Sequence, residues 1–192
     1  IIVIAAIAFY WILSIFFGFP IPRGTKVCAN YSSYYKNWNG IYYISVDNAL
    51  NLITHGHWGY LKGVDEETFT VLDDNWAKDS NTVWYMDQAI KEADVSSFYV
   101  NKSGLAKDKN HVYVYDTESR SFRPAKCNIN VQTAEYFVHK QNSLDLSWMR
   151  DKDFVYLDEA KLDVDRLTFA PLGNSYWWTD KNYVYRDGYG RF

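Results

Sequence analysis

The apolar and polar positions of the chain follow two different patterns. Residues 1–19 are apolar almost throughout and contain no Asp, Glu, Lys, Arg or His, and Pro20 follows them. As a helix this segment spans roughly 28 Å at about 1.5 Å per residue, close to the hydrocarbon thickness of a bilayer. The rest of the chain alternates short apolar runs with turn-forming residues, which is typical of short strands. We therefore expect a transmembrane helix over residues 1–19, a linker over residues 20–27 and a mainly β domain over residues 28–192.

Two other interpretations of the apolar segment remain open. A cleavable signal peptide has a shorter apolar region, about 7–15 residues, followed by a small-residue cleavage site, whereas residues 20–24 read Pro-Ile-Pro-Arg-Gly. A processed type IV pilin begins with an apolar helix, but pilins usually carry Glu at the fifth position, where this chain has Ala5, and their helix continues where Pro20 ends this one. The membrane anchor is the favoured interpretation. Arg23 and Lys26 after the span favour a cytoplasmic C-terminal side by the positive-inside rule. The rule compares the charges on both sides of a span, and the side before Ile1 is not in this sequence. The orientation therefore has to be decided by other features.

The β domain contains internal repetition. Four stretches begin with Asp-Lys-Asn or a variant of it and continue with Val and an aromatic residue, and a weaker copy is centred on Asn37. The clear copies begin at Asp79, Asp108, Asp151 and Asp180. Successive copies are 42, 29, 43 and 29 residues apart, so short and long units alternate. A period in this range is the signature of a repeat architecture.

A second repeated word precedes each of these turns. It reads Asp-x-x-Thr/Ser-Phe and begins at Asp65, Asp94 and Asp165, while Asn130 begins its best candidate in the remaining unit. An Asp at this place is expected to cap a single turn of helix, with the Phe pointing inward. The first word predicts a turn, because an Asx side chain accepts a hydrogen bond from the backbone two residues on.

Each repeat is therefore predicted to be a β-hairpin followed by a short helical turn. The Val-aromatic pairs are strand material, and hairpin turns are expected at Asp87-Gln88, Asp158-Glu159 and Asp187-Gly188. One repeat alone cannot bury its apolar face, so neighbouring repeats have to stack. The aromatic residues that recur at one repeat position are predicted to form the core: Trp84, Tyr113, Tyr156 and Tyr185.

These words resemble those of the DKNYY family of bacterial proteins. The resemblance is carried by Asp108-Lys109-Asn110-His111-Val112-Tyr113 and Asp180-Lys181-Asn182-Tyr183-Val184-Tyr185, and it covers about residues 60–188. The chain departs from the family word at Asp79-Ser80-Asn81 and Asp151-Lys152-Asp153. The family implies an exported, repeat-built domain and no particular chemistry.

Charge and composition narrow the function classes. The chain has a net charge of −3, and residues 1–26 contribute only the basic Arg23 and Lys26, so the remainder has 18 basic and 23 acidic residues, a net of −5. A nucleic-acid binder needs a basic face, so we expect no nucleic-acid partner. Aromatic residues make up 19% of the chain, which gives it abundant surface to bury and excludes a disordered protein.

The cysteine count favours an oxidising compartment. Cys28 and Cys127 are the two cysteines of the chain, and an even count in a surface-anchored domain favours a bridge between them, although both could be ordinary thiols. We expect this disulfide, and with it a single-pass protein of the bacterial inner (cytoplasmic) membrane whose C-terminal domain is periplasmic or extracellular.

No pattern in the sequence indicates catalysis, a cofactor or a metal. Asp-x-Asn resembles the start of a calcium loop, but the Gly and Glu of that loop are missing, and a cation would meet Lys109, Lys152 and Lys181. His55 and His57 could bind a metal, but no third ligand is evident nearby. Nucleophile and nucleotide-binding motifs are absent from the sequence, so we expect no catalytic, cofactor or metal residues.

Two segments that interrupt the repeats are the candidates for partner contacts. They cover about residues 46–60 and 116–130, and loops inserted into a repeat array often carry binding. The candidate contacts are Trp58, Tyr60, Phe122 and Arg123. We expect a non-catalytic accessory or scaffold subunit of an envelope complex that contacts the bilayer through residues 1–19 and other protein subunits through its repeats. A glycan-binding module and an envelope immunity protein are the alternatives.

Overall fold

The computed structural model describes Phe9 and residues 24–31, 33–45, 58–137, 148–172, 177–186 and 190–191. Apart from Phe9, the predicted transmembrane helix over residues 1–19 lies outside the described residues. Within the described part of the chain, no helix has the length and hydropathy needed to cross a bilayer. The chain divides into two compact units, residues 1–91 and residues 92–192.

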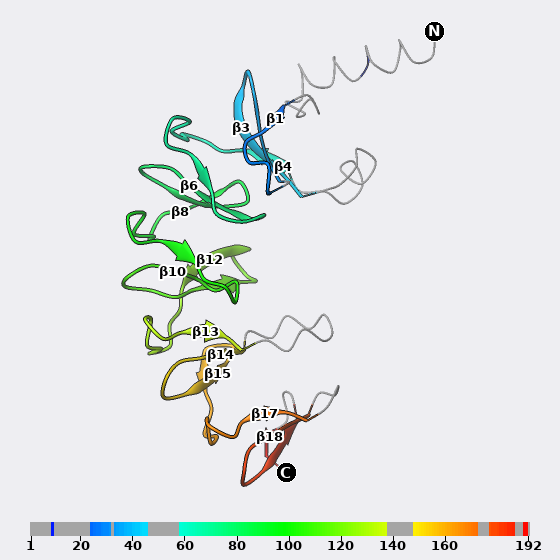
Figure 1. The fold of residues 1–192 in the computed structure, drawn as a ribbon, viewed down its shortest axis with the longest axis vertical. Helices are drawn as coiled ribbons and strands as arrows, with labels where there is room; N and C mark the ends of the chain where they lie inside the picture. The colour runs from blue at the N-terminus through cyan, green and yellow to red at the C-terminus, as the bar shows by residue number, and fades with distance from the viewer. Residues whose placement is uncertain are drawn as a thin grey trace. The chain divides into compact units, whose positions relative to one another are not determined.

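The first unit is built from two four-stranded antiparallel sheets (Figure 1). In both sheets the strands follow one another in chain order. The strands of the first sheet are β1 (Thr25–Lys26), β2 (Tyr34–Asn37), β3 (Gly40–Ile44) and β4 (Trp58–Tyr60). Those of the second are β5 (Thr70–Val71), β6 (Trp76–Lys78), β7 (Val83–Tyr85) and β8 (Gln88–Ile90). Strand β1 lies within the segment predicted as a linker.

The second unit contains two two-stranded and two four-stranded sheets, all antiparallel. The two-stranded sheets pair β9 (Tyr99–Val100) with β10 (Ala106–Lys107), and β11 (Tyr113–Asp116) with β12 (Ser121–Pro124). The next sheet contains β13 (Glu135–Tyr136), β14 (Trp148–Arg150), β15 (Val155–Leu157) and β16 (Ala160–Lys161). The last contains β17 (Ala170–Pro171), β18 (Trp177–Thr179), β19 (Val184–Arg186) and β20 (Gly190–Arg191).

The mainly β prediction is confirmed, and each predicted helical turn is at most an isolated turn that no helix continues. No helix occurs among the described residues from 24 to 191. The second word forms an isolated hydrogen-bonded turn, in which the N–H of Thr168 donates to Asp165 O at 3.1 Å and that of Phe169 donates to the same oxygen at 2.9 Å. The chain then enters strand β17 at Ala170, so it cannot add the successive bonds that a helix requires.

Two of the three predicted hairpin turns fall within the described residues. Asp158-Glu159 connects β15 and β16, and both residues have positive φ, 46° and 68°, as a type I′ hairpin requires. The other turn comprises Met86-Asp87, one residue earlier than predicted, because Tyr85 pairs with Gln88. Asp187-Gly188 lies outside the described residues.

Of the four recurring aromatic residues predicted to form the core, Trp84, Tyr113 and Tyr156 are buried, while Tyr185 is half-buried and packs against its cluster. In the first unit, Trp84 packs with Tyr34 and Tyr43. In the second unit, Tyr156 belongs to one apolar cluster, while another holds Trp178, whose ring centroid lies 4.4 Å from that of Trp148. The buried Phe residues of the second word, Phe98 and Phe169, are 2% and 5% exposed, which confirms that these rings point inward.

Candidate functional site

The four aspartates that begin the repeated turns are the most deeply buried carboxylates of the described chain. Their exposed fractions are 1–8%. In each turn, Oδ1 accepts hydrogen bonds from the backbone N–H groups two and three residues further on, at 2.7–2.9 Å. The Asx turns predicted from the sequence are therefore confirmed. The residues are Asp79, Asp108, Asp151 and Asp180.

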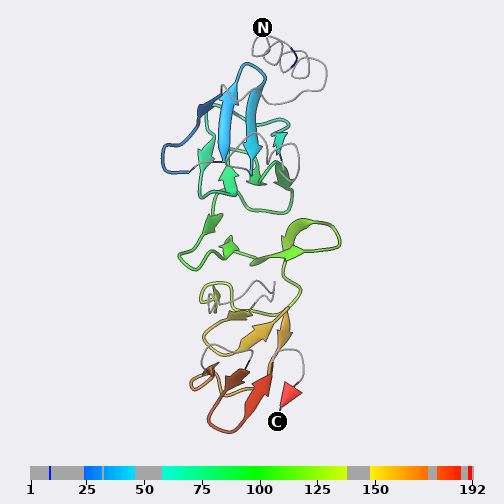
Figure 2. The same ribbon diagram turned by 90° about the vertical axis from the view of Figure 1, so that its right-hand side faces the viewer.

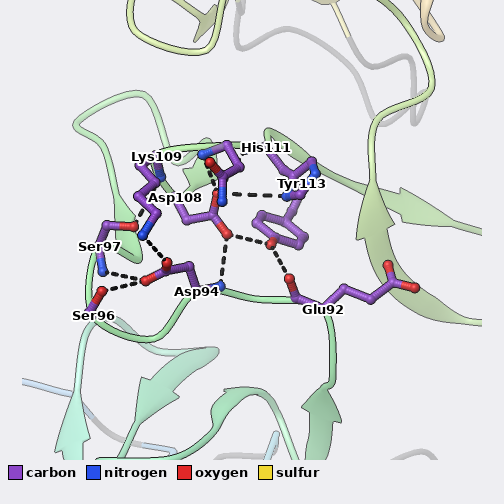
Figure 3. Close-up of polar contacts among 9 residues, drawn as sticks. Glu92, Asp94, Ser96, Ser97, Asp108, Lys109, His111 and Tyr113 are labelled. Carbon is purple, nitrogen blue, oxygen red and sulfur yellow. Dashed lines mark hydrogen bonds and ion pairs between the residues drawn. The ribbon is translucent and has the colours of Figure 1, made fainter.

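The second carboxylate oxygen of each turn aspartate reaches back to the preceding word. Oδ2 of Asp108 accepts the N–H of Asp94 at 2.9 Å and the hydroxyl of Tyr113 at 2.7 Å (Figure 3). The same backbone contact recurs at 2.8–2.9 Å in the other three repeats, where the donors are the N–H groups of Asp65, Asn130 and Asp165. Asn130 thus occupies the place that its sequence predicted.

A return contact closes each connection from the other side. The Thr or Ser hydroxyl of the second word accepts the backbone N–H of the residue that follows the turn aspartate, at 2.9–3.1 Å. We call this pair of reciprocal contacts the aspartate latch. Its hydroxyl members are Thr68, Ser97, Thr133 and Thr168. Each latch fixes a turn to a chain segment 14 to 21 residues earlier.

Lysine side chains add an ion pair to two of the latches. Lys109 Nζ lies 2.5 Å from Asp94 Oδ2, and Lys181 Nζ lies 2.5 Å from Asp165 Oδ2. In the first latch Ser80 replaces the lysine and donates its hydroxyl to Asp65 instead. The lysines have exposed fractions near 60%, and ion pairs this exposed contribute little, about 0–1 kcal/mol.

The environment of the latches shifts the pKa of their acidic groups in opposite directions. Burial raises the pKa of the Asp180 carboxyl, but hydrogen bonds from the N–H of Asp165, the Tyr185 hydroxyl and the turn N–H groups outweigh it and lower the pKa to about 2. The same balance lowers the pKa of Asp108 and Asp151. For Tyr156, burial and the neighbouring Asp151 carboxylate raise the pKa to about 12.

We expect the unfolding free energy to be greatest between pH 3.8 and pH 10.0, the unfolded pKa values of the carboxyl and the phenol. A lowered carboxyl pKa stabilises the folded chain above the unfolded value of 3.8 and loses that contribution as the pH falls through the folded value near 2. A raised phenol pKa stabilises below 10.0 and loses its contribution as the pH rises through 12. The urea concentration at the unfolding midpoint should therefore decrease when the pH is lowered below 3.8 or raised above 10.0. A midpoint that does not change between pH 3.8 and pH 2 would contradict the stabilising role of the latches.

The first latch lacks its aromatic hydroxyl. At the position of Tyr113, Tyr156 and Tyr185 it carries Trp84, which is 2% exposed. The buried Nε1 of Trp84 has no hydrogen-bond partner among the described residues. The indole therefore supplies packing without the donor that the phenols give to the other turn aspartates.

Lys107 is a buried cation that the sequence analysis did not single out. Its exposed fraction is 3%, and Nζ donates to the carbonyl oxygens of Val131, Gln132 and Ala134 at 2.8, 3.2 and 3.0 Å. It also lies 5.6 Å from the centroid of the Tyr99 ring. The ammonium thus donates to three backbone carbonyls of residues 131–134, the turn of the second word in the latch of Asp151.

The predicted partner contacts are partly used inside the protein. Tyr60 packs edge-on against Tyr42 at 5.4 Å and accepts a hydrogen bond from Asn37 Nδ2 at 2.9 Å. Phe122 packs against Tyr115 at 5.5 Å. Arg123 forms ion pairs with Asp116 at 2.8 Å and Glu159 at 2.7 Å, so it joins the β11–β12 hairpin to the turn after β15. Trp58 lies on β4 and pairs with Ile44.

The cysteines and histidines give no further site in the described part of the chain. Cys28 is a free thiol of the first unit and Cys127 a free thiol of the second, so the predicted disulfide is not confirmed. Burial raises the pKa of the Cys127 thiol, which lowers its reactivity. His55 and His57 lie outside the described residues, and no three His, Cys, Asp or Glu side chains within them are grouped to hold a metal.

Comparison with known proteins gives one family match. The model of the DKNYY family matches residues 26–117, which confirms the predicted family. The match begins earlier than the predicted range of about 60–188, because it takes in the β2–β3 hairpin, and it ends after the second latch. No curated protein and no solved structure matches the chain.

Proposed function

We propose that this chain, which matches the DKNYY family over residues 26–117, is a non-catalytic, membrane-anchored accessory or scaffold subunit of a bacterial envelope complex. Residues 1–19 would hold it in the inner membrane, and the repeat domain would bind protein partners outside the cytoplasm. The family match supports the repeat-built domain, and the apolar, uncharged composition of residues 1–19 supports the anchor.

The observation that carries the proposal is that, in the turns of the second unit, one residue holds the turn together while another is exposed to solvent. In the second unit the oxygens of the turn aspartate accept hydrogen bonds from backbone N–H groups and a phenol, whereas the third residue after it points outward. Phe154 and Tyr183 are 39% and 45% exposed, and the His111 side chain is 44% exposed. Rigid turns that expose aromatic rings at one repeat position suit recognition, since aromatic residues are enriched in protein interfaces.

The test is purification of the full chain from native membranes in mild detergent. We expect it to bring down a partner in stoichiometric amount, and Phe154→Ser combined with Tyr183→Ser to release that partner. The matched control is Leu167→Ser, because Leu167 is 86% exposed but lies outside the repeated position. A monomer at every protein concentration would contradict the proposal.

The same exposed rings favour a second candidate, a glycan-binding module of the cell wall. Aromatic faces stack on apolar faces of other rings. Lys161 Nζ lies 3.1 Å from the centroid of Phe154 and covers one face of that ring, so a sugar would have to stack on the opposite face. This candidate predicts retention of the chain on peptidoglycan and loss of retention in the Phe154→Ala and Tyr183→Ala variants. Retention that is unchanged in both variants would reject it.

A further inference from the structure

The register of the first sheet determines where the chain leaves it toward the N-terminus. Strand β1 runs antiparallel to β2, with Thr25 opposite Lys36 and Lys26 opposite Tyr35. Going backward from Thr25, the chain therefore runs toward the end of β2, where Trp38 and Asn39 form the turn into β3. Figure 2 shows β1, in dark blue, beside the end of β2 that leads into this turn.

Close packing at Gly24 keeps the chain beside that turn. A Cβ added at Gly24 would lie 2.8 Å from the backbone oxygen of Lys36 and 2.4 Å from the hydroxyl oxygen of Tyr42, both too short for contact between atoms that are not bonded. The glycine thus allows the chain to approach β2 and β3 directly before β1 begins. At Gly24 the chain therefore lies against the backbone of Lys36, two residues before the β2–β3 turn.

The β2–β3 turn is separated by a short segment from the apolar residues proposed to span the membrane. Residues 20–23 lie between that segment and Gly24, and four residues span at most about 14 Å when fully extended. If residues 1–19 occupy the hydrocarbon core, the turn lies within the reach of this segment from the edge of the core. The interfacial region adds several ångströms on each side of the hydrocarbon.

The side chain at the tip of this turn suits such a location. Trp38 is 67% exposed, whereas Trp76, Trp84, Trp148 and Trp178 are buried. Tryptophan is enriched at membrane–water interfaces, because its ring is apolar while its N–H remains hydrated. Asn39 beside it and Lys26 on β1 are exposed, and a lysine near the membrane attracts anionic phospholipid. Lys36 adds no net charge, because its Nζ lies 2.8 Å from the Glu66 carboxylate.

We propose that the β2–β3 turn, with Trp38 at its tip, binds the phospholipid headgroup region of the membrane and so orients the first sheet against the bilayer. This inference rests on the anchor of the proposed function. The partner is the lipid surface itself, since the register, the short segment and the exposed ring all point to the same side. The other end of the sheet, where Ile44 pairs with Trp58, would face away from the membrane.

Quenching of tryptophan fluorescence by brominated lipids tests this contact. The full chain is reconstituted into vesicles of phosphatidylcholine and phosphatidylglycerol, with bromine near the glycerol end of the acyl chains. We expect Trp38→Phe to remove a share of the quenched signal comparable to the share removed by Trp11→Phe, since Trp11 lies in the apolar segment. The matched control, Trp58→Phe, should leave the quenched signal unchanged.

The outcomes separate this inference from the proposed anchor. If the chain floats with the vesicles and Trp11→Phe reduces quenching but Trp38→Phe does not, the anchor stands and the contact of the turn is refuted. If Trp58→Phe reduces quenching as much as Trp38→Phe, the sheet is not oriented by its turn and the inference fails. A chain that neither floats nor shows quenching refutes the anchor, and the inference falls with it.

Discussion

Replacing Asp108 with Asn is expected to lower the unfolding free energy by about 3 kcal/mol. The amide nitrogen must face either the N–H groups of Asn110 and His111 or the N–H of Asp94 and the hydroxyl of Tyr113. Either orientation places donor against donor inside the latch, and a buried donor left without an acceptor costs about 1–3 kcal/mol. Urea unfolding of the full chain, followed by fluorescence, measures the loss.

Asn110→Ala is the matched control for this substitution. Asn110 belongs to the same turn, but its side chain is exposed, and its backbone N–H, which donates to Asp108 at 2.7 Å, is retained in alanine. Exposed substitutions of this kind change stability by about 0.5 kcal/mol or less. A latch that tolerates Asp108→Asn as well as Asn110→Ala would be a surface turn and not a structural element.

Lys107→Met should be the second most damaging of these substitutions, with an expected loss of about 2–3 kcal/mol. Methionine can fill the space of the lysine stem, but the carbonyls of Val131, Gln132 and Ala134 lose their shared donor. Ala134 O keeps the Asn101 Nδ2 donor at 3.4 Å, but the carbonyls of Val131 and Gln132 have to find water near a site where Lys107 itself is 3% exposed. Unsatisfied buried acceptors carry a desolvation cost. Hydrogen exchange should show faster opening of the turn over residues 131–134.

Lys102→Met provides the comparison, because Lys102 is an exposed lysine of the same unit. This variant should unfold at the same urea concentration as the unmodified chain. Equal stability of Lys107→Met and Lys102→Met would show that the three carbonyls are hydrated without the ammonium.

The sequence predicted the local parts of the repeat better than the contacts between them. The Asx turn at Asp108 follows from the chemistry of a side chain and a backbone two residues away, so it can be read directly. The inward Phe98 and the position of Asn130 follow from the same repetition. The length of the turn at Asp165 could not be predicted in the same way, because it depends on where strand β17 begins, and capping chemistry alone does not reveal that.

The pairing of the two words in each latch could have been predicted from their charges. Where Lys109 or Lys181 follows the turn aspartate, the second word begins with Asp94 or Asp165, and these are ion-paired. Where the second word begins with Asn130, the corresponding Lys152 has Asp153 beside it, 3.8 Å away. This complementarity of charge would have predicted that each turn contacts the second word that precedes it. Burial of Lys107 left no such signal, because its partners are backbone carbonyls, which every residue has.

The short span of each latch has a kinetic consequence. A latch joins residues separated by 14 to 21 positions, and the entropic cost of closing loops of this size rises only slowly with their length. Proteins dominated by such local contacts fold rapidly, and repeat arrays can begin folding at any repeat and extend from there. A chain organised in this way can acquire structure repeat by repeat while it emerges from the ribosome or a translocation channel, before its C-terminal residues are available.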